Sequence, residues 1–192
     1  AGSGVVHAMG GIIALAGAIV IGPRIGKYVD GRPQAIPGHH VPMVIAGTFI
    51  LAFGWFGFNP GSTLSGTDLR ISIVVVNTML AGVAGALTAH LMMNVKGMKP
   101  DPTMLCNGML AGLVAITASA GYVTLTSALI IGVLAGVICN LVARLVKGTF
   151  KIDDSLDVFA CHGVGGALGV IQAGVLATKA VNAGGADGLD IV

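Results

Sequence analysis

Six apolar runs without a charged residue divide this sequence. A helix needs about 20 apolar residues to cross the hydrocarbon core of a bilayer, and each run is close to that length. Hydrophobic residues make up 55% of the chain and charged residues only 9%, a balance that excludes a water-solvated surface. We predict an all-α polytopic membrane protein, a single transmembrane domain over residues 1–192. Its six transmembrane helices are expected at 2–22, 41–62, 71–93, 103–120, 122–143 and 158–178.

The basic residues predict which connections face the cytoplasm. Eight of the 10 Lys and Arg residues lie in the connections 23–40, 94–102 and 144–157. Cytoplasmic connections carry an excess of such residues. We therefore expect these three connections to be cytoplasmic, in a multi-pass protein of the plasma or inner membrane whose two ends both face outward.

A short motif, His-x-x-Gly-Gly, occurs in the first and the last apolar run, as His7 to Gly11 and as His162 to Gly166. The two runs are predicted to cross the membrane in opposite directions. Two copies in the same chain direction therefore indicate an inverted repeat about a pseudo-two-fold axis in the membrane plane, and substrate sites lie at such repeat interfaces. An ionisable side chain in hydrocarbon needs a partner, and the obvious partner of each histidine is the other.

Three interpretations of these histidines stay open on the motif alone. Ionisable residues facing a bundle interior are typical of a polar channel or transport site. Two histidines beside glycines are also typical of the axial ligation of a b-type haem. Packed, hydrogen-bonded histidines with no further role are the third interpretation.

Small and amide residues predict how the helices pack. Asn77, Asn107 and Asn140 are expected to form hydrogen bonds between helices. Glycines four residues apart allow helix backbones to approach closely. Such pairs occur at Gly108 and Gly112, at Gly132 and Gly136, and at Gly165 and Gly169.

Longer motifs connect the chain with a known family. They are Gly2-Ser-Gly-Val-Val-His7, Gly22-Pro-Arg-Ile-Gly26, Phe53-Gly-Trp-Phe-Gly-Phe-Asn-Pro-Gly-Ser62 and Asp153-Asp-Ser-Leu-Asp-Val-Phe-Ala-Cys-His-Gly163. Together they resemble the ammonium transporter (Amt/Mep/Rh) family, most nearly its Amt branch. The resemblance implies part of an inverted-repeat ammonium transporter fold, corresponding to spans five to ten of an eleven-helix protein. Four preceding helices, with the family's other gate phenylalanine and its outer-site tryptophan, and a last helix with a cytoplasmic tail then lie outside this sequence.

The same resemblance implies a role for six residues along a pore. The chain opens just after the position of the family's conserved aspartate on the first-histidine helix, so that residue has no counterpart here. The implied roles are paired pore histidines at His7 and His162, a pore-lining tryptophan at Trp55, a gate phenylalanine at Phe58, a hydroxyl for ammonium recruitment at Ser62 and a supporting aspartate at Asp157.

The implied activity is transmembrane transport of ammonium or ammonia. The cation is recruited outside, loses a proton before a dry lumen, and ammonia passes two neutral histidines. The resemblance also implies a homotrimer in the lipid bilayer and a PII-type regulatory protein as partner, with no enzymatic activity, cofactor, metal or nucleic acid. An ammonium sensor of the same family is the alternative, followed by a b-type haem-binding membrane subunit.

Three aspartates precede the last apolar run. Asp157 stands at its start, where a carboxylate also complements the positive end of a helix dipole. Asp153 and Asp154 are expected to be solvated loop charges.

Overall fold

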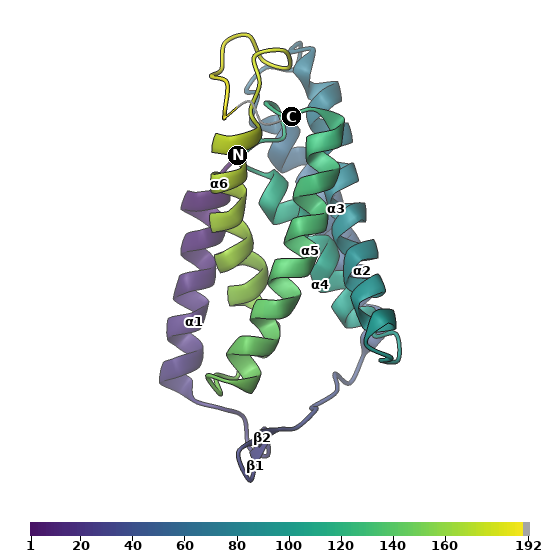
Figure 1. The fold of residues 1–192 in the computed structure, drawn as a ribbon, viewed down its shortest axis with the longest axis vertical. Coiled ribbons are helices and arrows are strands. Elements are labelled where there is room, and N and C mark those ends of the chain that lie inside the picture. Colours follow the sequence, from purple (N-terminus) through teal and green to yellow (C-terminus); the bar gives the residue numbers. More distant parts are fainter. Residues whose placement is uncertain (190–192) are drawn as a thin grey trace.

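The computed structural model describes residues 1–189 of the chain and is built almost entirely from helices that run up and down along one axis (Figure 1). Two short π-helical segments, η1 and η2, each continue directly into an α-helix. A two-stranded antiparallel hairpin lies between the first two long helices. The elements are η1 Ser3–Ala8, α1 Met9–Ile21, β1 Tyr28–Val29, β2 Arg32–Pro33, α2 Val41–Gly61, α3 Arg70–Val95, α4 Pro102–Ile116, α5 Leu125–Gly148, η2 Phe159–Val164 and α6 Gly165–Leu176.

Within residues 1–189, five helices are long and apolar enough to cross a membrane. They are η1 with α1 (Ser3–Ile21), α2, α3, α5, and η2 with α6 (Phe159–Leu176). Each lies along an expected apolar run, and this agreement confirms the prediction of an all-α polytopic membrane protein. The first helix begins, and α6 ends, at the end of the bundle opposite the β1–β2 hairpin (Figure 1).

The fourth helix differs from its predicted span. The run 103–120 predicts a membrane-crossing helix, but α4 ends at Ile116 and has 15 residues, a rise of about 22 Å. Irregular backbone follows, and it is satisfied from a neighbouring helix, because the Asn77 Nδ2 atom donates to the carbonyl oxygens of Ala120 and Val123. Non-helical backbone at membrane depth needs such internal partners.

The fourth helix forms the centre of the bundle, in contact with α2, α3, α5, α6 and both π-helical segments. Its glycines lie where the sequence predicts close packing. A Cβ on Gly108 would come 2.6 Å from the Gly85 carbonyl oxygen of α3, and a Cβ on Gly136 of α5 would come 2.8 Å from that same oxygen. Both distances are far below normal contact, so only glycine permits these backbone approaches.

The two copies of the histidine motif pack against each other in a reciprocal way. A Cβ on Gly11 would overlap the backbone of Gly163, and a Cβ on Gly166 would come 2.6 Å from the Ala8 amide nitrogen. Each contact joins the residue four positions after one histidine to the residue one position after the other. A contact that repeats when the copies are exchanged is what a two-fold relation between them requires.

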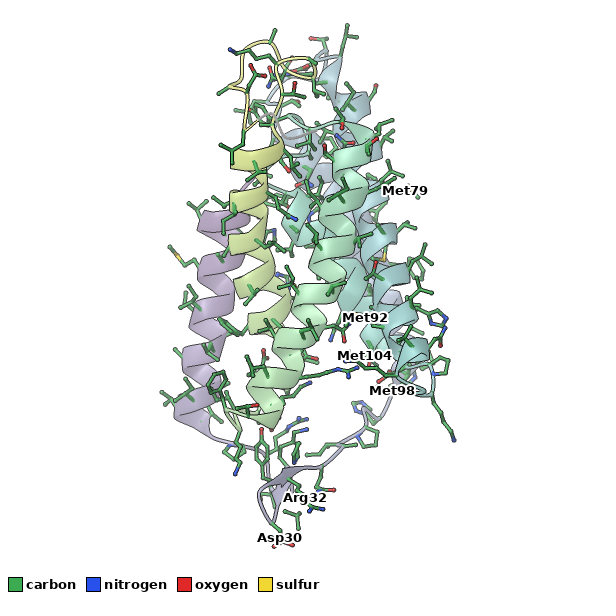
Figure 2. All side chains as sticks on the ribbon, in the orientation of Figure 1. Asp30, Arg32, Met79, Met92, Met98 and Met104 are labelled. Atoms are coloured by element: carbon green, nitrogen blue, oxygen red, sulfur yellow. The ribbon has the colours of Figure 1, made fainter. Side chains whose placement is uncertain are left out.

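Basic side chains gather at the hairpin end of the bundle. Arg24 forms an ion pair with Asp153, with 2.7 Å between Nε and Oδ2, and the Arg144 guanidinium reaches the Met98 sulfur at 3.3 Å. Figure 2 shows Asp30 and Arg32 at the tip of the hairpin, beyond the helix ends. Arg70 opens α3 at the opposite end. By the excess of Lys and Arg, the hairpin end is the end that the sequence predicts to face the cytoplasm.

Candidate functional site

The two histidines meet on adjoining π-helical segments, which open the membrane spans Ser3–Ile21 and Phe159–Leu176. His7 lies in η1 and His162 in η2. Their Nδ1 atoms are 3.4 Å apart, and the ring centroids are 5.4 Å apart with 32° between the planes. When both histidines are neutral, one Nδ1 carries a hydrogen and donates a hydrogen bond, and the other Nδ1 accepts that bond. Isolated π-helical turns are rare and often occur at functional sites, and nothing in the motif predicts them.

Two aromatic side chains of α2 contact the first histidine. The Trp55 indole stacks on the His7 ring, with centroids 5.2 Å apart and 13° between the planes. Phe58 lies edge-on to the same ring, with centroids 5.7 Å apart. The two sit three positions apart, so both side chains point from one face of the helix. The residues expected to line a pore and form its gate therefore contact the expected histidine.

A hydroxyl of the irregular segment after α4 fixes the indole ring. Trp55 Nε1 donates to Thr117 Oγ1 at 2.9 Å, and that hydroxyl donates to the Leu113 carbonyl oxygen at 2.7 Å. Thr117 is 2% exposed, so the pair is shielded from water. Thr117 was not predicted as a site residue, because no pattern in the sequence relates positions 55 and 117.

A partly polar cavity of about 120 Å³ opens beyond these rings, at the end of the bundle away from the hairpin. Ser62 lines this outer cavity together with Asn59, Arg70, Thr117 and Tyr122. The Ser62 hydroxyl donates to the Phe58 carbonyl oxygen at 2.7 Å. The lone pairs of the Ser62 oxygen remain free to accept a hydrogen bond. A residue that binds an N–H donor needs such an acceptor.

The acidic residues before η2 take different places from those expected. Asp154, not Asp157, caps the helix, because its carboxylate accepts from the backbone N–H groups of Val158 and Phe159 at 2.9 Å and 2.8 Å. The expectation that Asp153 and Asp154 are solvated is wrong, since they are 7% and 6% exposed. Hydrogen bonds from the Arg24 side chain hold the pKa of Asp153 at about 2.

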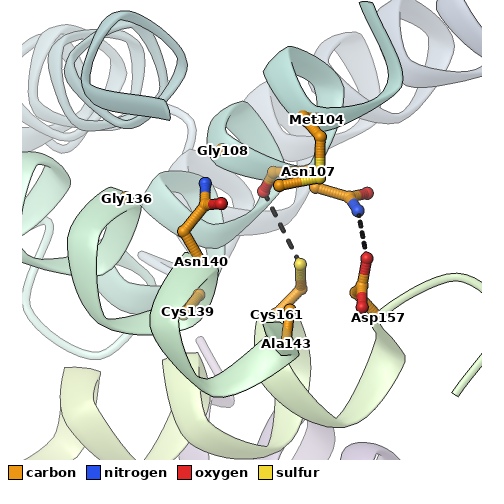
Figure 3. Close-up of a pocket in the computed structure, with 9 residues that line it drawn as sticks. All are labelled: Met104, Asn107, Gly108, Gly136, Cys139, Asn140, Ala143, Asp157 and Cys161. Carbon is orange, nitrogen blue, oxygen red and sulfur yellow. Dashed lines mark hydrogen bonds between the residues drawn. The ribbon is translucent and has the colours of Figure 1, made fainter. Parts of the chain in front are cut away.

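Asp157 instead lies between helices. Its Oδ2 atom accepts from Asn107 Nδ2 of α4 at 3.0 Å, and its Oδ1 atom is 2.7 Å from Lys147 Nζ of α5. Burial raises the pKa of Asp157, and the neighbouring Lys147 charge opposes that rise. Figure 3 shows Asn107 and Asp157 joined beside a small cavity. Asn140 also lines it, but its buried Oδ1 has no hydrogen-bond partner within residues 1–189, so only two of the three asparagines bond across helices as expected.

A sequence profile of the Ammonium Transporter Family matches residues 1–191. The chain belongs to the ammonium transporter family. It is 50% identical over 178 residues to the ammonium transporter Amt2 of Archaeoglobus fulgidus, covering 92% of this chain and 38% of that protein. It is 43% identical to the ammonium transporter Amt1 of Methanocaldococcus jannaschii, covering 91% of this chain and 44% of that protein.

Solved structures of ammonium transporter relatives share the fold. A structure titled Sensor Amt Protein superposes with a TM-score of 0.90 at 41% identity, covering 94% of this chain and 44% of that one. Saccharomyces cerevisiae Mep2 gives a TM-score of 0.84 at 38% identity, covering 95% and 40%. This chain therefore spans less than half the length of the relatives named here.

Proposed function

We propose that this chain forms the histidine-bearing part of a pore for ammonium or ammonia, in a multi-pass protein of the plasma or inner membrane. The observation that carries the proposal is the contact between His7 and His162 at 3.4 Å between Nδ1 atoms, with Trp55 stacked on one ring. Relatives named as ammonium transporters support the choice of substrate. No covalent conversion of the substrate is part of the proposal.

Ammonium and potassium ions have the same charge and similar size, so selectivity must use the N–H groups and the removable proton of ammonium. In our proposal the outer cavity recruits the cation through the acceptor oxygen of Ser62, which lines it. The rings of Phe58 and Trp55 then meet the cation on its way to His7, where an aromatic face attracts a positive charge. The apolar interior then opposes the charge. Ammonium gives one proton to an imidazole nitrogen, and ammonia passes the two rings. The proton is handed on through the His7–His162 pair and rejoins ammonia at the far end, so net charge crosses the membrane.

The decisive experiment uses a full-length transporter that carries this segment. Ammonium-evoked current, measured with and without competing potassium, is compared for the wild type and for the His7→Ala, His162→Ala and double Ala variants. We expect each single variant to lose selective conduction, because the remaining histidine loses its partner at a cost of about 1–3 kcal/mol. Normal ammonium flux with potassium still excluded in the double variant would contradict the proposal.

An ammonium sensor is the second candidate, favoured by the TM-score of 0.90 with the structure titled Sensor Amt Protein. A sensor binds ammonium at the same residues and reports its presence without sustained flux. Binding of ammonium measured by calorimetry, together with an absence of evoked current in the wild type, would select the sensor. Current that saturates with ammonium would select the transporter.

Direct contact between the histidine rings disfavours the haem interpretation. Axial ligands of a haem stand on opposite faces of the macrocycle, whereas the two Nδ1 atoms here are 3.4 Å apart with no room for a porphyrin between the rings. A Soret band at stoichiometric haem in the purified protein would reverse this conclusion.

Membership in the family also leads us to propose a homotrimer with one pore per protomer and a cytoplasmic PII-type protein as regulator. Light scattering on the detergent-solubilised full-length protein tests the trimer. Co-purification with a PII-type protein under changing ammonium supply tests the regulator, which would act at the end carrying the hairpin.

A further inference from the structure

Asp157 is a carboxylate enclosed by protein at the point where η2 begins. The residue is 5% exposed, and its Oδ1 atom has no contact with solvent. Its partners come from two other helices, Asn107 of α4 at 3.0 Å and Lys147 of α5 at 2.7 Å. The three side chains therefore join α4, α5 and the start of η2 at one place.

Solvent is too scarce here to balance the carboxylate charge. The cavity beside Asp157 holds about 10 Å³, the room of a single water molecule. An enclosed carboxylate is costly unless it is paired and hydrogen-bonded. The Lys147 side chain is 26% exposed, so its ammonium group reaches the carboxylate from the rim of the bundle and supplies the compensating charge.

The backbone around Asp157 connects this charge pair with the second histidine. The Asp157 carbonyl oxygen accepts the Cys161 N–H at 2.8 Å, and Cys161 precedes His162. The Cys161 thiol points back to the Asn107 carbonyl oxygen at 3.6 Å (Figure 3). Asp157 itself has a φ of 57°, a left-handed backbone conformation that a non-glycine residue keeps only when its surroundings hold it there.

We propose that Lys147, Asp157 and Asn107 form a charge-compensated clamp that sets the position of η2 and thereby of the His162 imidazole. Lys147 and Asn107 are positioning residues and do not touch the substrate. The inference rests on the proposed function, since its readout is transport past His162. The ion pair keeps the buried contact between α4, α5 and the start of η2 electrically neutral. A neutral pair of side chains of similar shape should therefore hold η2 in the same position.

The test is a charge-removal cycle in a full-length transporter that carries this segment. Lys147→Met removes the positive charge and keeps the length of the side chain. Asp157→Asn removes the negative charge and keeps an acceptor for Asn107, and the double variant is neutral at both positions. Lys151→Met is the matched control, because Lys151 is an exposed lysine of the same connection and has no ion pair among the described residues.

We expect Lys147→Met to lower the maximal ammonium current by at least about tenfold, because it leaves a buried charge without a partner. Adding Asp157→Asn should restore the current to within about threefold of the wild type, a coupling typical of residues in direct contact. The apparent KM should change little, since the outer cavity lies at the opposite end. The yield and the melting temperature should be lowest for Lys147→Met and should recover in the double variant. If Lys147→Met fails to fold, this recovery still tests whether the two charges depend on each other.

Two outcomes would overturn the clamp. Normal current in Lys147→Met would show that the charge needs no compensation. A double variant as inactive as Lys147→Met, despite recovered yield, would show that Asp157 must be charged for conduction itself. A wild type and a Lys151→Met control that both fail to conduct would instead contradict the proposed function.

Discussion

The Trp55 indole lies nearly parallel to the His7 imidazole, with 5.2 Å between ring centroids. Thr117 holds the indole N–H, so the stacked ring cannot turn without losing that hydrogen bond. His7 is therefore confined by the face of Trp55, the edge of Phe58 and the ring of His162. The orientation of the histidine pair depends on a hydroxyl that touches neither ring of the pair.

Thr117→Val should loosen this arrangement while preserving the side-chain shape. The indole N–H would remain buried without an acceptor, at a cost of about 1–3 kcal/mol in the free energy of unfolding. Thermal unfolding in detergent, followed by tryptophan fluorescence, measures the loss, because Trp55 is the one tryptophan in the chain. Thr67→Val, at an exposed position, is the control, and equal melting temperatures for both variants would contradict the assigned role.

The outer cavity gives a prediction for recruitment. Ser62→Ala removes an acceptor for ammonium and should raise the apparent KM by about tenfold, as expected for one hydrogen bond to a charged group.

Phe58→Ala should admit potassium, because the edge-on ring beside His7 is removed. Phe53→Ala on the same helix is the control, since that side chain is 80% exposed and points elsewhere. Wild-type KM and wild-type potassium exclusion in the two test variants would remove both residues from the pathway.

Two adjacent glycines of the second motif should respond differently to the same change. In Gly166→Ala the new Cβ would lie 2.5 Å from the Ser3 carbonyl oxygen, whereas in Gly165→Ala it would lie 3.4 Å from the nearest atom, a methyl of Val114. We expect a loss of about 1–3 kcal/mol for the first and a neutral effect or a gain of up to about 1 kcal/mol for the second. Melting temperatures of the purified variants check the order, which the reciprocal packing requires.

The Arg24 to Asp153 ion pair predicts a dependence of stability on pH. Hydrogen bonds from Arg24 lower the Asp153 pKa from 3.8 to about 2, so the pair stabilises the folded state above about pH 4 and the contribution is lost as the pH falls through 2. Arg24→Gln should therefore cost on the order of 1 kcal/mol at pH 7, after allowance for the half-exposed arginine. The difference from the wild type should shrink below pH 4 and be mostly lost at pH 2. Melting curves from pH 2 to 7 measure it, with Arg32→Gln at the exposed hairpin tip as control.

The helices and their packing were predictable because hydrocarbon imposes strong local rules. Runs of apolar residues must be helical, and glycines four residues apart allow close backbone approach, which Gly108 and Gly136 make and Gly165 does not. The repeated histidine motif also indicated which two spans come together. These predictions needed only patterns that are periodic or repeated within the sequence.

Other parts of the site depend on contacts that no local pattern records. Asp154 takes the capping place considered for Asp157. Asp157 adopts a left-handed conformation and lies between helices instead. The early end of α4 brings Thr117 to the indole, and the apolar run that continues to residue 120 does not indicate it. Sequence indicates the kind of residue at such places, and the partner is known only once the helices are positioned.

The separation of His7 and His162 along the chain has a consequence for assembly. Helices α3, α4 and α5 are consecutive and pack through short-range neighbours, so they are able to associate as soon as they leave the ribosome. The histidines are 155 positions apart, and the first must wait in the membrane until η2 and α6 are inserted. Closure of the pair therefore follows the insertion of α2 to α5, and a chain interrupted before η2 would hold a bundle with one unmatched imidazole.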